Sequence, residues 1–111
     1  MDVRTIGIIG YGAFGALVRT LIGRFAPNVE VRVHSEHHLA DGNIFFSLAD
    51  AAASDAVVFA VPIAAFEDVL QKTLPLMRKD SVIVDVATVK VHPVSLLKRL
   101  AGKPPSIAPH P

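Results

Sequence analysis

The stretch Thr5–Gly15 reads TIGIIGYGAFG, a short apolar run followed by glycines spaced G-x-G-x-x-G. Apolar residues at helical spacing come next, which is the order expected for a strand, a tight turn and a helix N-terminus. Gly10 permits the turn, Gly12 lets a pyrophosphate approach the backbone, and Gly15 lets the helix pack closely on the strand. Because the first N–H groups of a helix lack intrahelical partners, this stretch predicts dinucleotide binding. The alternative is a glycine turn with a purely structural role.

Segments of two kinds alternate along the rest of the chain, apolar β-branched runs and runs with helical periodicity. The expected strands cover residues 4–9, 29–34, 44–46, 56–61, 81–86 and 106–108. The expected helices cover residues 13–25, 47–54, 62–74 and 88–100, and Ser47 is expected to be the N-cap of the second. This alternation predicts an α/β fold with a doubly wound, mainly parallel sheet of the Rossmann type. Since the last strand leads directly to the end of the sequence, we expect the sheet to be incomplete at its C-terminus.

Length and composition exclude several classes of protein. The 111 residues suffice for one domain, and a formal net charge of +1 gives no reason to expect nucleic acid or a membrane surface as partner. The absence of cysteine excludes disulfides and thiolate metal sites. No apolar run approaches the ~20 residues of a membrane span, and the first four residues do not form a signal peptide. We therefore expect a cytoplasmic protein, or a plastid protein if the source is a plant, although no transit peptide is seen.

The end of the second expected strand bears on the choice between NAD and NADP. Many NAD sites place an Asp or Glu there to bind the ribose hydroxyls, but this strand ends in His34 and Ser35. The Ser35 hydroxyl can donate to a phosphate oxygen, and His34, His37 and His38 can also donate and would bind better when protonated. These residues favour NADP over NAD. NAD stays open as an alternative because Glu36 is close enough to serve as the ribose carboxylate.

The three histidines near this strand end do not predict a metal site. Their spacing matches no known ligand pattern, and no fourth ligand is evident. We therefore expect no bound metal and a solvated loop at this point.

Ligands of a doubly wound sheet lie beyond the carboxyl ends of its strands, where the turn residues and the residues after each strand meet. The residues expected to bind the dinucleotide are Gly10, Tyr11, Gly12, Ala13, Phe14, Gly15, His34, Ser35, Val61, Pro62 and Thr88.

Four segments, in this order, carry a resemblance to a known family. They are the G-x-G-x-F-G turn at Gly10–Gly15, the strand Val57–Pro62, the segment Val84–Lys90 and the closing pair His110–Pro111. Together they resemble the N-terminal domain of the prephenate and arogenate dehydrogenases of tyrosine biosynthesis. The glycine turn is shared with many dehydrogenases, whereas an Asp-Val-x-Thr-Val-Lys segment followed some twenty residues later by His-Pro is far more specific. A turn with Phe before its last glycine and a strand end without a carboxylate look more like the arogenate branch that uses NADP.

The resemblance implies a function and two catalytic residues. It implies NADP-linked oxidative decarboxylation of prephenate or arogenate, with residues 1–111 as the cofactor-binding half, inactive alone. His110 matches the catalytic histidine that hydrogen-bonds the ring hydroxyl of the substrate. Thr88 matches the serine beside that histidine and the nicotinamide, with an added methyl group. A C-terminal helical domain that this chain lacks supplies the family's substrate-binding arginine and its homodimer contacts.

Two other functions remain open from the sequence. The same glycine turn would serve another NAD(P)-dependent reductase, of the hydroxyacid or pyrroline-carboxylate type. A non-catalytic nucleotide-sensing module is the second alternative, since an exposed sheet edge would suit pairing with another chain. For His110 itself, the simpler interpretation without the resemblance is a tail residue with no catalytic role.

Overall fold

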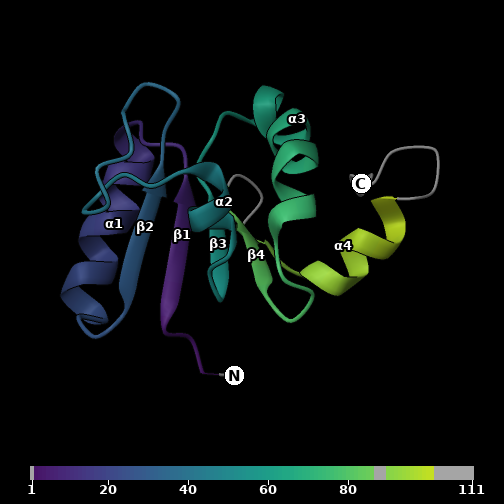
Figure 1. The fold of residues 1–111 in the computed structure, drawn as a ribbon, viewed down its shortest axis with the longest axis horizontal. Helices are drawn as coiled ribbons and strands as arrows, with labels where there is room; N and C mark the ends of the chain where they lie inside the picture. The colour runs from purple at the N-terminus through teal and green to yellow at the C-terminus, as the bar shows by residue number, and fades with distance from the viewer. Residues whose placement is uncertain (1, 87–89, 102–111) are drawn as a thin grey trace.

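A computed structural model describes residues 2–86 and 90–101 of the chain, and these residues form a five-stranded sheet with helices on both faces (Figure 1). The strands are β1 Thr5–Ile9, β2 Glu30–His34, β3 Ala56–Phe59, β4 Val82–Asp85 and β5 Lys90–Pro93. The helices are α1 Ala13–Phe25, α2 Leu48–Ala52, α3 Ile63–Thr73, the short 3₁₀ helix η1 Leu74–Leu76 and α4 Val94–Ala101.

The strands lie in the order β2-β1-β3-β4-β5, and the first four strands in this order form three parallel pairs. The chain runs from β1 to β2 on one side and then returns to β3 on the other side of β1. That reversal makes the gap beyond the carboxyl end of β1 the topological switch point, where ligands of such sheets bind. The register aligns His34, Ile9 and Phe59 across three neighbouring strands. The segments that follow these strands therefore meet at one edge, and the expected mainly parallel α/β sheet is confirmed.

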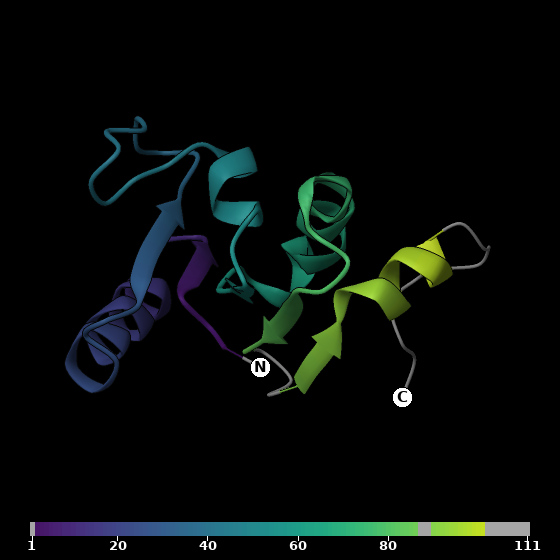
Figure 2. The ribbon, with the colours of Figure 1, turned by 60° about the horizontal axis from the view of Figure 1, so that its bottom comes forward.

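Each face of the sheet has its own apolar core, and Figure 2 shows α1 on one side with α2 and α3 on the other. Alternate residues of a strand point to opposite faces, so neighbouring apolar positions divide between the two cores. One core combines Ile9, Val57, Phe59 and Ile83 with residues of α2, α3 and α4. The other combines Ile8, Val33 and Val58 with partly buried residues that include Val18 and Ile22 of α1. All four residues of β3 are buried, as a continuous apolar run predicts.

Gly7 lets the short helix α2 pack directly on β1. A Cβ atom at this position would lie 2.1 Å from the carbonyl oxygen of Ala51, closer than atoms can approach. The helix begins after Ser47, whose hydroxyl accepts the backbone N–H of Asp50 at 3.1 Å. The predicted N-cap role of Ser47 is confirmed.

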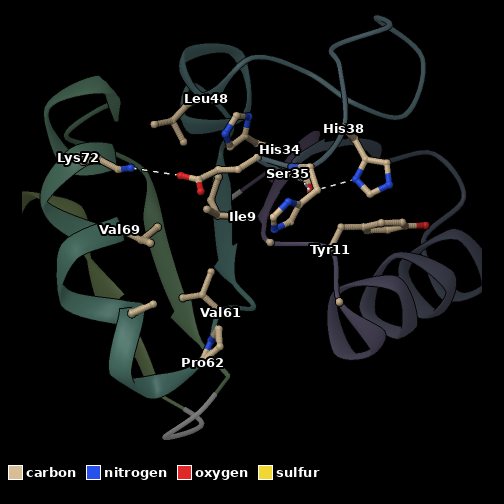
Figure 3. A pocket seen from close by; sticks show the side chains of 15 residues that line it. Ile9, Tyr11, His34, Ser35, His38, Leu48, Val61, Pro62, Val69 and Lys72 are labelled. Carbon is tan, nitrogen blue, oxygen red and sulfur yellow. Dashed lines mark hydrogen bonds and ion pairs between the residues drawn. The ribbon is translucent and has the colours of Figure 1, made fainter.

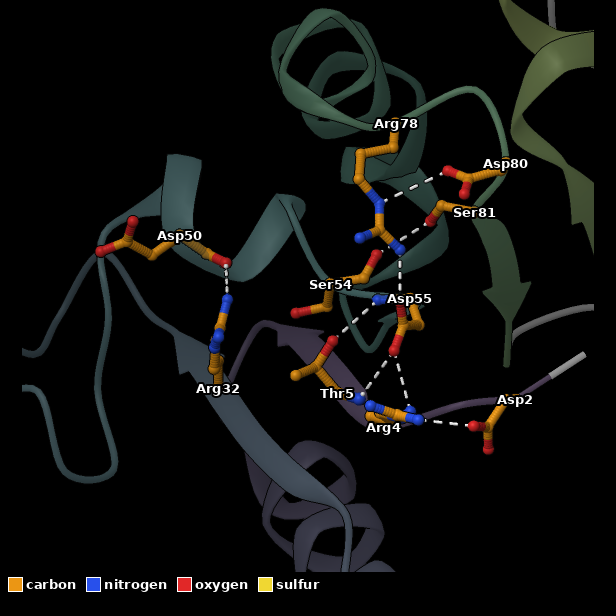
Figure 4. Close-up of polar contacts among 10 residues, drawn as sticks. All are labelled: Asp2, Arg4, Thr5, Arg32, Asp50, Ser54, Asp55, Arg78, Asp80 and Ser81. Atoms are coloured by element: carbon orange, nitrogen blue, oxygen red, sulfur yellow. Dashed lines mark hydrogen bonds and ion pairs between the residues drawn. The ribbon is translucent and has the colours of Figure 1, made fainter.

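Asp55, directly before β3, links the start of β1 to Arg78, which precedes β4 (Figure 4). Its carboxylate accepts the backbone N–H groups of Arg4 at 2.8 Å and of Thr5 at 3.1 Å, and it pairs with the guanidinium of Arg78. The backbone N–H of Arg4, followed by the Arg78 side chain, holds the pKa of Asp55 well below its usual range. Only about a fifth of the Asp55 side chain is exposed (21%), so solvent screens these contacts only in part.

Two elements differ from the expectation. The strand expected over residues 44–46 is a single parallel bridge between Val33 and Phe45. The helix expected over residues 88–100 is wrong at residues 90–93, because these residues form β5, antiparallel to β4, before α4 begins at Val94. Pro93 explains the boundary, since proline cannot donate a ladder hydrogen bond and suits the end of an edge strand. The strand expected at residues 106–108 lies outside the described residues.

Of the helices in the described ranges, none combines the length and the apolar character that a membrane crossing requires.

Candidate functional site

The glycine turn after β1 has the shape that its spacing predicts. Gly10 adopts φ = 101°, and a Cβ there would lie 2.6 Å from the carbonyl oxygen of Ala60, so only glycine fits. Its N–H donates to the carbonyl of His34 at 2.8 Å, which ties the turn to the end of β2. At Gly15 a Cβ would lie 2.4 Å from the carbonyl oxygen of Gly10. Both glycines are therefore required by the packing of the turn itself.

Gly12 is different, because nothing in the described chain requires a glycine there. Its φ of −79° is ordinary, and no heavy atom of the described residues would lie within 4 Å of an added Cβ. Gly12 is the N-cap of α1 and lines a cavity. The space that its missing side chain leaves is thus open for a bound molecule.

The N-terminus of α1 favours an anion at this open space. Gly12 has no side chain that could cap the helix, and no acidic residue stands in the first turn. The leading N–H groups of a helix lack intrahelical partners, and the helix dipole adds partial positive charge. A phosphate group placed beside Gly12 would meet both.

A cavity of about 530 Å³ opens beside the turn, between the end of β2 and helix α3 (Figure 3). This volume is within the range of small-molecule sites. Its walls come from the glycine turn, from the segment after β2 and from α3 with the residues before it. The lining residues are Ile9, Gly10, Tyr11, Gly12, His34, Ser35, Glu36, His37, His38, Leu48, Val61, Pro62, Ala65, Val69 and Lys72.

A second, shallower hollow lies on the other side of the turn. It has a volume of about 340 Å³ and is lined by Phe14, Ala60, Val61, Pro62, Ile63 and Val86. Val61 and Pro62 line both hollows, so the two spaces meet at the residues that follow β3. An elongated ligand could therefore extend past the turn from one hollow into the other.

The polar side chains at the end of β2 also hold the loop that follows. His34 Nδ1 lies 3.0 Å from the carbonyl oxygen of Phe46, and because a carbonyl only accepts, this nitrogen carries the hydrogen. The buried Ser35 hydroxyl accepts the N–H of His37 at 3.2 Å and bonds His38 Nδ1 at 3.0 Å. Ser35 and His34 thus lie at the cavity wall, but both already have partners within the chain.

An aromatic cluster that the sequence did not predict joins this loop to the glycine turn. The ring of His38 stacks on Phe45 with centroids 4.2 Å apart and planes 6° apart. The ring of Tyr11 is nearly perpendicular to both, with its centroid 5.2 Å from that of Phe45 and 5.9 Å from that of His38. The one signal in the sequence was an aromatic residue between the first two motif glycines. The cluster fixes the loop over one end of the cavity.

An ion pair reaches from one wall of the cavity to the other. Lys72 Nζ of α3 lies 3.3 Å from Glu36 Oε1 in the segment after β2 (Figure 3). The two residues are 36 positions apart in the sequence, which is why no local pattern indicated the pair.

The structure brings together most of the residues expected to bind a dinucleotide. The first cavity is lined by Gly10, Tyr11, Gly12, His34, Ser35, Val61 and Pro62, and the second by Phe14, Val61 and Pro62. Ala13 and Gly15 line neither hollow and contribute the first turn of α1. Thr88 and His110, the expected catalytic residues, lie outside the described residues. Within residues 2–86 and 90–101, no group of three or more His, Asp or Glu side chains could hold a metal ion.

Comparison with family models gives one match over most of the chain. Residues 26–111 match the family described as "Prephenate dehydrogenase, nucleotide-binding domain". The match begins after the glycine turn and includes Thr88 and His110, so it does not depend on the motif that this family shares with other dehydrogenases. No curated protein matches the chain.

Solved structures of dehydrogenases and reductases share the fold. An NAD-dependent formate dehydrogenase from Staphylococcus aureus, solved with NAD, is 25% identical with a TM-score of 0.57. An acyclic imino acid reductase, solved with NADPH and D-Arg, is 24% identical with a TM-score of 0.55. D-2-hydroxyisocaproate dehydrogenase is 21% identical with a TM-score of 0.55. The matches cover 74%, 74% and 72% of this chain but only 26%, 27% and 26% of those proteins, so the chain spans about a quarter of their length.

Proposed function

The chain belongs to the prephenate dehydrogenase family as its nucleotide-binding domain, and from that premise we propose that its glycine turn binds a nicotinamide dinucleotide. The observation that carries this proposal is the open space at Gly12, beside the N-terminus of α1, which no described side chain caps. The pyrophosphate would occupy that space, because both the N–H groups and the helix dipole favour an anion there.

The two hollows suit the two halves of such a cofactor. The adenosine half belongs in the larger cavity, since the ribose of a dinucleotide is bound beside the end of the second strand. The nicotinamide half then belongs in the smaller hollow, against Phe14 and Val86. Val86 precedes the segment that contains Thr88, the residue we propose beside the nicotinamide.

We propose NADP rather than NAD as the cofactor. The end of β2 carries His34 and Ser35, with no carboxylate at the position that binds ribose hydroxyls in many NAD enzymes. The similar structures do not decide the question, because one was solved with NAD and another with NADPH.

For the whole protein we propose oxidative decarboxylation of prephenate or arogenate. The bound nicotinamide would supply the hydride acceptor. His110, as a neutral imidazole, would accept the proton of the ring hydroxyl as that oxygen becomes a carbonyl. Loss of carbon dioxide makes the ring aromatic and drives the reaction forward. Thr88 would orient His110 and the nicotinamide with its hydroxyl.

The same proposal assigns the remaining parts of the site to another domain. Residues 1–111 would form the dinucleotide-binding domain, and a C-terminal helical domain of the longer protein would bind the substrate carboxylate and form a homodimer. The small share of the similar structures that this chain spans is consistent with that division.

Calorimetric titration of the 111-residue chain with NADP and with NAD tests the proposal. We expect binding of at least one cofactor, tighter for NADP, and no turnover of prephenate or arogenate by this chain alone. A folded sample, verified by circular dichroism, that binds neither cofactor would overturn the proposal. Turnover by the longer protein, measured as NADPH formation with each substrate, would identify the substrate. Activity with a hydroxyacid or with pyrroline carboxylate instead would favour the other reductases.

A further inference from the structure

The charged residues of the larger cavity form one pair. Among the described residues that line it, Glu36 carries the only carboxylate, and Lys72 is the only lysine or arginine. They come from opposite walls, Glu36 from the segment after β2 and Lys72 from the last turn of α3. Figure 3 shows the side chain of Lys72 directed across the cavity toward this segment. The electrostatics of the ribose end of the cavity therefore depend on how these two charges are arranged.

Glu36 alone would favour a dinucleotide that has ribose hydroxyls and no 2′-phosphate. A carboxylate two residues after β2 accepts hydrogen bonds from the 2′ and 3′ hydroxyls of a ribose. The same carboxylate repels a 2′-phosphate, which carries between one and two negative charges near neutral pH. NAD and NADP differ only in that group, so an unopposed Glu36 would select NAD.

Lys72 opposes this effect in two ways. Its ammonium group, 3.3 Å from the carboxylate, offsets the negative charge of Glu36. It also brings a cation to the wall that faces the end of β2, and a lysine ammonium binds phosphate as a point charge. Both side chains are more than half exposed, at 60% for Lys72 and 71% for Glu36. Such a pair is weak, so Lys72 can turn toward a phosphate at little cost.

Two of the other polar groups at this end of the cavity already have partners within the chain. Ser35 Oγ already bonds both His37 and His38, and His34 Nδ1 already donates to Phe46. None of the described lining residues is an arginine, the usual partner of a 2′-phosphate.

We propose that Lys72 determines cofactor choice, by offsetting the charge of Glu36 and offering its ammonium to the 2′-phosphate of NADP. The inference rests on the proposed function, since it assumes that the ribose lies in the larger cavity. It places the determinant of cofactor choice on α3, which lies close to the end of β2 in space but 36 positions beyond Glu36 in the sequence.

Equilibrium binding to the 111-residue chain and its variants tests the inference. The variants are Lys72→Gln, Lys72→Arg and Glu36→Gln, with Lys79→Gln as the matched control because Lys79 is exposed and lies outside the cavity lining. Each is titrated with NADP and NAD, and also with 2′,5′-ADP and 5′-AMP, which isolate the contribution of the 2′-phosphate. Thermal unfolding of each variant verifies that it is folded.

We expect Lys72→Gln to raise the Kd for NADP and 2′,5′-ADP about tenfold or more, the size of a lost charge-assisted contact. The Kd for NAD and 5′-AMP should stay the same or fall. Lys72→Arg should keep the wild-type ratio of the two Kd values, and Glu36→Gln should shift it toward NADP. Lys79→Gln should leave all four values unchanged.

Three outcomes contradict the proposals, and they are distinguishable. If wild type binds NAD or NADP but Lys72→Gln leaves the ratio of their Kd values within about twofold, the role of Lys72 is wrong and the proposed function stands. A shift of that ratio toward NADP in Lys72→Gln overturns the role as well. If folded wild type binds neither cofactor, the proposed function fails, and the role of Lys72 fails with it.

Discussion

Gly12 is the residue where we expect a substitution to weaken ligand binding without lowering the stability of the fold. The described chain leaves its side-chain position empty, and its backbone angles suit any residue. A side chain there should therefore affect a bound anion far more than it affects the fold. Gly10 and Gly15 cannot be used in this way, because a Cβ at either position would collide with the backbone.

We expect Gly12→Ser to weaken NADP binding about tenfold or more while leaving the free energy of unfolding equal or raised by a few tenths of a kcal/mol. Serine is a good N-cap, and its hydroxyl would take the helix N–H groups that the pyrophosphate needs. Calorimetry and chemical denaturation measure the two effects. Gly23→Ala is the matched control, since a Cβ at Gly23 of α1 also meets no described atom within 4 Å. Equal loss of binding in both variants would contradict the role of Gly12.

Asp55 is the residue that should make stability depend on acid pH. Its pKa is lower in the folded chain than in the unfolded chain, chiefly because its carboxylate accepts the N–H of Arg4. It therefore stabilises the fold above its unfolded pKa of about 3.9, and this stabilisation is lost as the pH falls through the folded value.

At pH 7, Asp55→Asn should lower the free energy of unfolding by about 1–3 kcal/mol, because a partly buried set of hydrogen bonds loses its charged acceptor. Urea unfolding between pH 2 and pH 7 measures this. The difference between wild type and variant should shrink below pH 4. Asp2→Asn is the control, since the pair of Asp2 with Arg4 is mostly exposed (79% and 83%) and should contribute almost nothing. A constant difference at every pH would rule out this explanation.

Among the elements, the contact of α2 with β1 depends on Gly7, because any side chain at this position would collide with α2. Gly7→Ala should lower the melting temperature, with a loss of stability of about 1–3 kcal/mol, because α2 must move to make room for the Cβ. Thermal unfolding monitored by circular dichroism measures the loss. Ala53→Gly is a useful comparison, because Ala53 is the exposed C-cap of the same helix and its replacement changes α2 without changing the contact. A Gly7→Ala variant as stable as wild type would mean that α2 is not held against β1.

The elements with strong local signals could be predicted from the sequence. The glycine turn, the β3 run and the Ser47 cap each depend on neighbouring residues, and all three form as expected. The segment 88–100 could not be predicted in the same way, because its residues suit both a helix and a strand. Residues 90–93 form β5 because they pair with β4, and such pairing between segments cannot be read from the local sequence. The pair of Lys72 with Glu36 was missed for the same reason.

Across the whole molecule, apolar periodicity predicted which residues of α1 share a face but not which are covered. Leu17 and Val18 belong to the same apolar pattern, yet Leu17 is 50% exposed whereas Val18 packs in the core beside β1. The difference depends on which side of α1 packs against the sheet, and that packing joins segments that no single window of sequence contains. The same limit applies to the candidate site, since its walls come from segments far apart in the chain.

The position of β5 at the border of the sheet has a kinetic consequence. β5 pairs only with β4 among the described strands, whereas β1 lies between β2 and β3. Backbone amides should therefore exchange with deuterium first in β5 and α4 and last in β1, because edge segments open in smaller cooperative units. Hydrogen exchange read by mass spectrometry measures this order, and early exchange in β1 would contradict it. That border could then open and close many times while the larger cavity, beside the carboxyl ends of β1 and β2, keeps its shape.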